Sequence, residues 1–146
     1  MPWSKTDFEG VWVFEPQVFA DSRGYFFESF NASKLEGTDI ANAFVQDNEA
    51  KSSRGVLRGL HYQIGANAQS KLVRVVTGEV LDVIVDIRPG SKTYGKHFSI
   101  LLNEENKKQL FVPKGFAHGY LVLTDDTIFA YKCDAYYDKA NEGGIK

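Results

Sequence analysis

The sequence predicts an all-β protein, a sandwich or barrel of short strands with at most short helices. Apolar and aromatic runs of five to nine residues recur along the chain, and short segments rich in Gly, Asp, Asn, Ser and Pro separate them. Only one segment, NASKLEGTDI, has the composition and the length for a short helix. Frequent turns in a chain of 146 residues favour a sandwich or barrel over units that alternate strand and helix.

Each expected strand follows from its own apolar run and from the turn that closes it. The runs at 11–19 and 24–30 flank the turn sequence DSRG, and the possible helix follows at 31–40. The runs at 71–78 and 79–87 meet at a Thr-Gly turn. The remaining runs, separated by the turn sequences RPGS, NEEN and TDD, lie at 96–102, 109–113, 118–123 and 127–133.

The segment EVLDVIVDI alternates two sets of side chains, as a strand with two different faces does. The wholly apolar set, which is predicted to face the core, is Leu81, Val83, Val85 and Ile87. The mixed set is Val80, Asp82, Ile84 and Asp86. Carboxylates beside apolar neighbours indicate a lined cavity rather than open solvent. We therefore expect Asp82 to face a functional site, whereas Asp86 stands where the strand leaves for a turn.

The charge and composition of the chain argue against several classes of protein. The formal net charge of −2 provides no general attraction to nucleic acid or to an anionic membrane. No apolar run approaches the roughly 20 residues that span a bilayer, and the first ten residues lack the apolar core of a signal peptide. We expect one cytoplasmic domain over residues 1–146, binding neither nucleic acid nor membrane. The lone Cys133 argues against an intrachain disulfide and a thiolate zinc cluster.

Five segments of the sequence form an ordered set of motifs. They are DSRGYFFESFN, VQDNEAKSSRGVLRGLHYQ, SKLVRVVTGEVLDVIVDIRPGS, QLFVPKGFAHGYLVL and YKCDAYYDKANEGGIK. In this order and spacing, from about Phe14 to the last residue, the sequence resembles the dTDP-4-dehydrorhamnose 3,5-epimerase family. The resemblance implies a cupin-type jelly roll that forms a homodimer and needs neither cofactor nor metal. It also implies epimerisation of dTDP-4-dehydro-6-deoxy-D-glucose at C3 and C5, which yields dTDP-4-dehydro-L-rhamnose for rhamnose biosynthesis.

The chemistry of such an epimerisation defines the side chains that the site needs. The hydrogens on C3 and C5 flank the C4 ketone, so removing either gives an enolate that a nearby cation stabilises. An imidazole suits the base, and a phenol on the opposite face suits the acid that returns the proton. The positions that match the family's are His61 as base, Tyr131 as acid and Lys71 as the cation. Taken singly, each has a structural alternative: a core histidine, a cross-strand aromatic residue and a surface lysine.

A second set of residues matches the family's substrate-binding positions. Guanidinium groups bind a pyrophosphate through paired hydrogen bonds, while amides and carboxylates bind a pyrimidine edge and ribose hydroxyls. The matching residues are Arg23, Glu28, Gln46, Asp47, Asn48, Arg58, Tyr137 and Glu142. By the resemblance, Arg23 and Glu28 serve the neighbouring subunit's site, Tyr137 stacks near the ligand, and Glu142 contacts it. Taken without the resemblance, the segment QDN would be interpreted as a polar turn and the segment YYDKANEGG as a surface loop.

His118 lies in PKGFAH, a spacing that metal-binding cupins share. Such cupins also need two histidines and a carboxylate from an earlier motif, so that several ligands converge on one ion. Here Gln63 stands where the second of those histidines would be, and no Glu follows at the required spacing. We therefore predict that there is no metal site. We also predict that Asp82 holds His118 in place and that His118 contacts the substrate. A purely structural histidine is the alternative.

One feature of the family is expected to be missing. In the family, an Asp in a later Lys-Asp segment pairs with the base histidine, and this sequence ends at Lys146 before such a segment. Three explanations stay open: the sequence is a C-terminally shortened version of an active epimerase, it is an epimerase-like domain with reduced activity, or Asp82 or another carboxylate substitutes for the missing Asp. Two further alternatives stay open: a non-catalytic cupin that binds nucleotide sugars, and a relative that inverts one centre or shifts the ketone.

Overall fold

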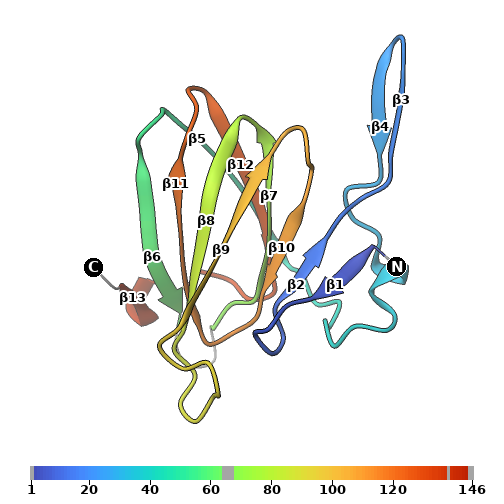
Figure 1. The fold of residues 1–146 in the computed structure, drawn as a ribbon. Coiled ribbons are helices and arrows are strands. Elements are labelled where there is room, and N and C mark those ends of the chain that lie inside the picture. Colours follow the sequence, from blue (N-terminus) through green and yellow to red (C-terminus); the bar gives the residue numbers. More distant parts are fainter. Residues whose placement is uncertain (1, 64–67, 138, 145–146) are drawn as a thin grey trace.

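The computed structural model describes residues 2–63, 68–137 and 139–144, and it is almost entirely β (Figure 1). The strands are β1 (Trp3–Lys5), β2 (Trp12–Phe14), β3 (Val18–Asp21), β4 (Gly24–Phe27), β5 (Gln46–Ser52), β6 (Leu57–Gln63), β7 (Lys71–Thr77), β8 (Glu79–Asp86), β9 (His97–Asn103), β10 (Gln109–Val112), β11 (Phe116–Val122), β12 (Thr127–Cys133) and β13 (Glu142–Gly144). Short 3-10 helices occur at η1 (Ala32–Leu35), within the segment expected to be helical, and at η3 (Lys139–Asn141).

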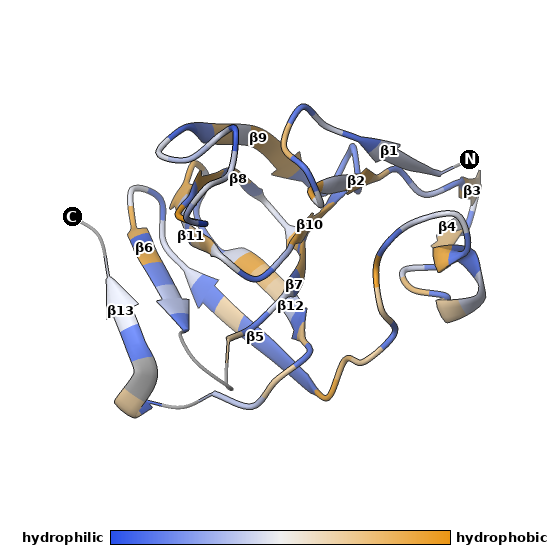
Figure 2. Ribbon diagram, turned by 90° about the horizontal axis from the view of Figure 1, so that it is seen from below, coloured by the Kyte–Doolittle hydropathy of each residue, from blue (hydrophilic) through white to orange (hydrophobic). Residues whose placement is uncertain are grey.

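Two antiparallel sheets form the body of the molecule. The six-stranded sheet has the order β1-β2-β10-β7-β12-β5, and the five-stranded sheet has the order β13-β6-β11-β8-β9. Figure 2 shows the strands of both sheets around a common interior. The expected all-β jelly roll is therefore confirmed. A separate hairpin of β3 and β4 projects away from this body (Figure 1).

The strand pattern differs from the expectation in several places, and β1, β6 and β13 were not among the expected strands. The apolar run at 11–19 forms two strands rather than one, because Pro16, which has no backbone N–H to donate, lies between β2 and β3. β5 is missing from the expected strands because its sequence, QDNEAKS, is almost wholly polar. It forms an edge of the six-stranded sheet and turns alternate side chains toward the interior.

β8 buries the face that carries its carboxylates, so the prediction that the opposite face forms the core is wrong. The fully buried side chains are Val80, Asp82, Ile84 and Asp86. Those that keep partial exposure are Leu81, Val83, Val85 and Ile87. The interior accepts the carboxylates because each has a partner there: His118 bonds Asp82, and Arg88 pairs with Asp86.

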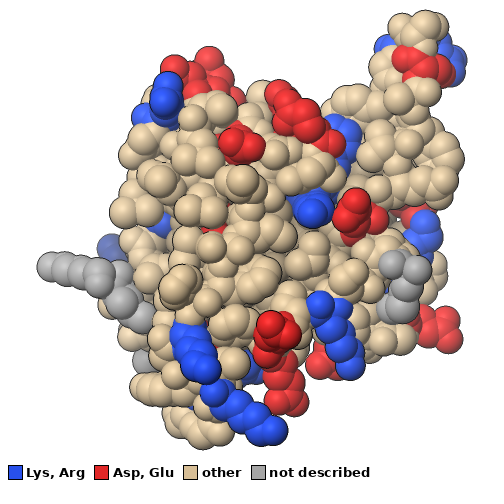
Figure 3. All heavy atoms as spheres, in the orientation of Figure 1, with Lys and Arg blue, Asp and Glu red and all other residues tan. Residues whose placement is uncertain are grey.

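The outward face of the five-stranded sheet carries a row of leucines. In cross-strand order they are Leu57, Leu121, Leu81 and Leu101, on β6, β11, β8 and β9. Leu57 is 71% exposed and Leu101 is 46% exposed. Figure 3 looks onto this face, where most charged side chains lie toward the margins and the middle is largely uncharged. A contiguous apolar row of this kind is typical of a surface that another protein covers.

The outer face of the six-stranded sheet is partly covered by the chain itself. The segment 28–45 packs over it and buries Leu35 and Ile40 in a second apolar cluster. The strand residues of this cluster are Trp3, Trp12, Phe14, Leu72 and Phe111. The side-chain amide of Gln109 donates to the carbonyl of Ser29 at 2.8 Å and fixes the start of the segment. The hairpin of β3 and β4 therefore leaves from an anchored base.

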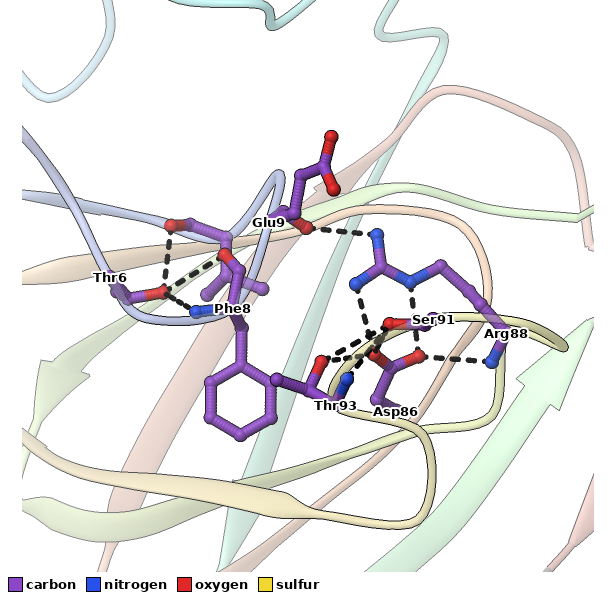
Figure 4. A network of polar contacts seen from close by, with 8 residues as sticks. Thr6, Phe8, Glu9, Asp86, Arg88, Ser91 and Thr93 are labelled. Carbon is purple, nitrogen blue, oxygen red and sulfur yellow. Dashed lines mark hydrogen bonds and ion pairs between the residues drawn. The ribbon is translucent and has the colours of Figure 1, made fainter.

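Asp86 is the centre of a buried polar network (Figure 4). Arg88 donates to its carboxylate through Nε and Nη2, each at 3.0 Å, and the hydroxyls of Ser91 and Thr93 also donate to it. Arg88 donates in addition to the carbonyl of Glu9 at 2.9 Å. Burial alone would raise the pKa of Asp86, but these hydrogen bonds hold that pKa well below its usual range. The network ties the turn after β8 to the N-terminal loop.

We expect Asp86→Ala to lower the free energy of unfolding by about 3 kcal/mol at neutral pH, because Arg88, Ser91 and Thr93 lose their shared acceptor. Urea denaturation measures this loss. The pKa of Asp86 is depressed in the folded state, so its stabilisation is present above the unfolded pKa of about 4 and is lost as the pH falls below it. The difference in the free energy of unfolding between the parent protein and Asp86→Ala should therefore become smaller at acid pH.

The matched control is Asp21→Ala, which removes an ion pair with Arg23 on the exposed hairpin. Solvent screens an exposed pair of this kind, so its loss should change the free energy of unfolding little. Equal losses for the two variants would show that the Asp86 network does not stabilise the fold.

Candidate functional site

A polar pocket opens between the two sheets, on the side where their edge strands β5 and β13 lie. Its cavity volume is about 460 Å³. The residues that line it are Gln46, Asn48, His61, Tyr62, Gln63, Gln69, Lys71, Tyr131, Tyr137 and Glu142. All three residues assigned to catalysis by the sequence are among them, together with four of those assigned to binding.

The pairing of three neighbouring strands brings the residues of the six-stranded sheet into this pocket. β12 lies between β7 and β5, with Tyr131 opposite Asn48 and Cys133 opposite both Lys71 and Gln46. Side chains on directly opposite residues share a face of the sheet. Tyr131, Asn48, Lys71 and Gln46 therefore point to the same side, and Cys133 is buried beneath them.

Lys71 and Tyr131 are close neighbours on this wall of the pocket. The ammonium nitrogen of Lys71 lies 5.4 Å from the centroid of the Tyr131 ring. Burial lowers the pKa of Lys71, while the nearby Cys133, Asp82 and Glu142 oppose that shift. Burial also raises the pKa of Tyr131, and its hydrogen bond with Asn48 acts in the opposite direction. A phenol with a raised pKa keeps its proton at neutral pH, as a general acid must.

His61 lies on the facing sheet, in β6. Its side chain is 55% exposed, and its Nδ1 atom lies 3.3 Å from Oε1 of Glu142. The other carboxylate oxygen of Glu142 accepts a hydrogen bond from the hydroxyl of Tyr137. The imidazole and the Tyr131 phenol therefore belong to different sheets, with the pocket between them.

Asp82 and His118 form a buried pair deeper in the interior. Nε2 of His118 lies 3.0 Å and 2.8 Å from the two carboxylate oxygens of Asp82, so the expected contact between these residues is present. Burial raises the pKa of Asp82, while His118 opposes the shift. His118 is also the cross-strand partner of His61 in the ladder of β11 and β6. The pair thus lies behind the histidine that the pocket exposes.

Tyr120 belongs to the same interior and was not expected from the sequence. Its ring stacks on Phe129, with centroids 4.0 Å apart, and it is the cross-strand partner of both Asp82 and Arg58. Burial raises the pKa of Tyr120 to about 12, so the phenol stays protonated. The sequence signal available was its spacing of two residues after His118, which places both side chains on one face of a strand.

Besides the buried pair Asp82 and His118, four of the predicted residues lie outside the pocket lining. Arg58 donates through Nε to Ser52 at 3.0 Å, yet it is near enough for its charge to oppose part of the rise that burial causes in the pKa values of Tyr120 and Tyr131. Asp47 lies on the opposite face of β5 and accepts from Lys132 at 3.0 Å. Arg23 and Glu28 are on the projecting hairpin and its base, where they pair with Asp21 and Lys34 (Figure 1).

Three lining residues were not assigned to the site by the sequence: Tyr62, Gln63 and Gln69. Gln69 donates to the carbonyl of Ala135 at 2.8 Å and so holds the chain just after β12. Gly143 lies against Tyr62, because an added Cβ there would be 2.2 Å from the aromatic ring. The sequence offered only the proximity of Tyr62 and Gln63 to His61 as a signal.

Among residues 2–63, 68–137 and 139–144, no group of three or more His, Cys, Asp or Glu side chains could hold a metal ion. The described chain also contains no helix long and apolar enough to cross a membrane.

The fold and the pocket together define a class of protein, a cupin-type jelly roll with an imidazole, an amine and a phenol around one polar cavity. A family profile described as dTDP-4-dehydrorhamnose 3,5-epimerase matches residues 5–146, and the chain belongs to this family of isomerases. The dTDP-4-dehydrorhamnose 3,5-epimerase of Shigella flexneri is 54% identical over 144 residues, which cover 97% of this chain and 78% of the relative.

Solved structures of relatives share the whole described fold. The crystal structure of dTDP-4-dehydrorhamnose 3,5-epimerase from Elizabethkingia anophelis has a TM-score of 0.93 at 50% identity, covering 99% of this chain and 79% of that one. The dTDP-6-deoxy-D-glucose-3,5-epimerase of Legionella pneumophila, solved in complex with dTDP-4-keto-L-rhamnose, has a TM-score of 0.93 at 48% identity. That match covers 98% of this chain and 76% of the Legionella chain.

We expect Lys71 to lose its charge at a lower pH than an ordinary lysine, whose pKa is 10.5, because burial lowers its pKa. NMR of ¹³Cε-labelled lysines measures the titration, and Lys71→Arg assigns the signal. Glu142→Gln should lower the titration midpoint further, since it removes a negative charge that favours the ammonium. A Lys71 signal that titrates at or above 10.5 in the parent protein would contradict this account.

Proposed function

We propose that this chain epimerises dTDP-4-dehydro-6-deoxy-D-glucose at C3 and C5 to give dTDP-4-dehydro-L-rhamnose. The observation that carries the proposal is the arrangement of the pocket: His61 on one sheet faces the wall of the other sheet that holds Tyr131 and Lys71. Inversion of a carbon needs a base and an acid on opposite faces of the sugar ring, and this arrangement supplies both. Membership of the epimerase family supports the same reaction.

The proposed step is the same at each centre. His61 takes the proton from the carbon beside the C4 ketone, and the electron pair of the broken C–H bond passes to the ketone oxygen as an enolate. The ammonium of Lys71 stabilises that negative oxygen. Tyr131 then donates its proton to the opposite face of the carbon, the ketone forms again, and solvent restores both side chains. The C4 ketone itself makes the C–H bonds acidic, so the step is written without a cofactor.

The nucleotide is proposed to bind beside these three residues. Gln46 and Asn48 line the pocket and offer amides that suit a pyrimidine edge and ribose hydroxyls. Tyr137 offers a ring for stacking, and Arg58 offers a charge for the pyrophosphate. His118, held by Asp82, is proposed to contact the sugar. Because a nucleoside diphosphate is too highly charged to cross a bilayer unaided, we expect the protein to act in the cytoplasm.

The substrate test is solvent deuterium exchange into dTDP-4-dehydro-6-deoxy-D-glucose, followed by NMR. Label at both C3 and C5 supports the proposed reaction. Label at one carbon alone would support a single-centre epimerase, and binding without label would support a non-catalytic nucleotide-sugar cupin.

The His61 and Tyr131 variants should lose activity in different ways. The change at His61 prevents removal of the proton from carbon, whereas the change at Tyr131 prevents return of a proton to the opposite face. His61→Asn should abolish deuterium exchange at both carbons. Tyr131→Phe should keep some exchange with retained configuration, while net inversion falls by about 10²–10⁴. Both variants should still bind dTDP, which calorimetry checks. His61→Asn that exchanges at the parent rate would refute the assignment of the base.

We further propose a homodimer in which each site is completed by the neighbouring subunit. The hairpin of β3 and β4 exposes aromatic side chains that a second copy would cover, with Phe26 70% exposed and Tyr25 59% exposed. The leucine row on the five-stranded sheet offers a second apolar surface for such a partner. The resemblance implies that Arg23, in the turn of this hairpin, and Glu28, at its base, serve the neighbouring site, and neither residue lines the pocket of its own chain.

A mixed dimer tests the shared site. Subunits with Arg23→Ala and subunits with His61→Asn are co-expressed with different affinity tags, and the mixed dimer is purified through both tags. One of its two sites should then contain an intact His61 and an intact Arg23. Such a mixed dimer should have about half of the activity of the unmutated dimer, although a homodimer of either variant is impaired. A mixed dimer of His61→Asn and Lys71→Met should stay inactive, because both residues come from the same pocket. If the mixed dimer of Arg23→Ala and His61→Asn recovers no activity, the proposal that the two subunits share each site is refuted.

A further inference from the structure

The loop between β9 and β10 reaches across to the projecting hairpin of β3 and β4, and Figure 1 shows both at the same end of the molecule. Nζ of Lys107, in this loop, lies 3.8 Å from the centroid of the Tyr25 ring and 5.5 Å from that of Phe27. Tyr25 and Phe27 are two residues apart on β4, so both rings lie on one face of the hairpin. An ammonium group is attracted to the negative face of an aromatic ring. Lys107 therefore joins the body of the molecule to the hairpin.

The backbone of Lys107 has a conformation that lysine rarely adopts. Its φ of 53° lies in the left-handed region, where a side chain costs energy and where glycine or asparagine is usual. Two asparagines hold the loop in this shape. The backbone N–H of Asn106 donates to Oδ1 of Asn103 at 2.7 Å, and Oδ1 of Asn106 accepts from the backbone N–H of Lys108 at 2.9 Å. A strained residue that its surroundings hold in place points to a function for its side chain.

The contact lies close to the turn of the hairpin. Tyr25 is two residues from Arg23, the turn residue that is proposed to serve the neighbouring site. Arg23 itself pairs with Asp21 of the same hairpin, so that ion pair does not attach the hairpin to the body. The ammonium of Lys107 also donates to the carbonyl of Glu104, which ties the side chain to its own loop. Lys107 thus connects the far part of the hairpin to a loop that is itself well fixed.

The other face of the hairpin stays open. Phe19 and Phe26 are directly opposite each other in the register of β3 and β4, and they alternate with the rings that Lys107 contacts. Phe19 is 57% exposed and Phe26 is 70% exposed. The lysine therefore holds the hairpin by one face and leaves the second face for another subunit.

We propose that Lys107 is a positioning residue, which holds the hairpin in the place from which Arg23 reaches the neighbouring subunit's site. A two-stranded hairpin alone is only marginally ordered in water. A side chain at its turn can therefore contribute fully to a site on another subunit only when the hairpin is fixed to its own body. The cation on the β4 face supplies that attachment. This inference rests on the shared site proposed above.

The test uses Lys107→Gly, because glycine removes the cation and accepts the left-handed backbone better than lysine does. The ¹⁵N order parameter of the Gly24 amide reports on the hairpin, and we expect it to fall from about 0.85 to below about 0.6. The Kd for dTDP and the KM should both rise about 2- to 10-fold. The kcat should stay nearly unchanged, because the change affects substrate binding and not proton transfer.

Three controls separate the cation from other effects of the substitution. Lys107→Arg keeps a cation over the two rings and should retain the order parameter and the affinity of the parent protein. Lys92→Gly removes an equal charge from the exposed turn after β8 and should change neither quantity. Tyr25→Leu should act as Lys107→Gly does. The double variant should be little worse than either single variant, since both remove the same contact.

An unchanged order parameter for Gly24 in Lys107→Gly would overturn the inference, and so would an equal loss in Lys107→Arg. A lower order parameter with an unchanged Kd for dTDP would overturn both the positioning role and the shared site. The proposed reaction can fail separately. If the parent protein exchanges no deuterium into the substrate, while the Kd for dTDP still responds to Lys107→Gly and not to Lys92→Gly, the reaction fails and the positioning role stands.

Discussion

The hydrogen-bonded register of β12 between β7 and β5 is the constraint on which the site depends. Because side chains alternate along a strand, a slip of one residue would turn Tyr131 to the outer face and bring Lys132 inward. The same slip would expose Phe129 and Cys133, which are fully buried in the present register. The hydrophobic core therefore selects the register, and the register in turn places Tyr131 beside Lys71 and Asn48.

The interior of this sandwich shows how two carboxylates on one strand face can have opposite properties. Asp82 and Asp86 are both fully buried, yet burial raises the pKa of Asp82 whereas hydrogen bonds lower that of Asp86. The difference comes from the number and charge of the donors, because Asp86 meets Arg88 and two hydroxyls while Asp82 meets one imidazole. Asp86 therefore stabilises the fold, whereas Asp82 lies close to the residues proposed to act in catalysis.

The two walls of the pocket come from different positions in the two sheets. Lys71 and Tyr131 come from the middle of the six-stranded sheet, where strands pair on both sides. His61 and Glu142 come from β6 and the edge strand β13 of the other sheet. Catalysis by a base and an acid on opposite faces needs both walls at a fixed separation, while substrate entry needs one of them to be accessible. The imidazole of His61 is 55% exposed and the ring of Tyr131 is partly buried, which suits the roles proposed for the two walls.

The sequence by itself determined the all-β fold, because short alternating runs and turn residues are local features that each strand carries. The ordered motifs also allowed His61, Lys71 and Tyr131 to be named by resemblance. Only the tertiary structure decided which face of β8 is interior, since a period of two shows that residues share a face but not which way it points. It also decided that Glu142 lies against His61 and that Asp47 turns away from the pocket. These outcomes depend on pairing between strands far apart in the chain, which local propensity does not encode.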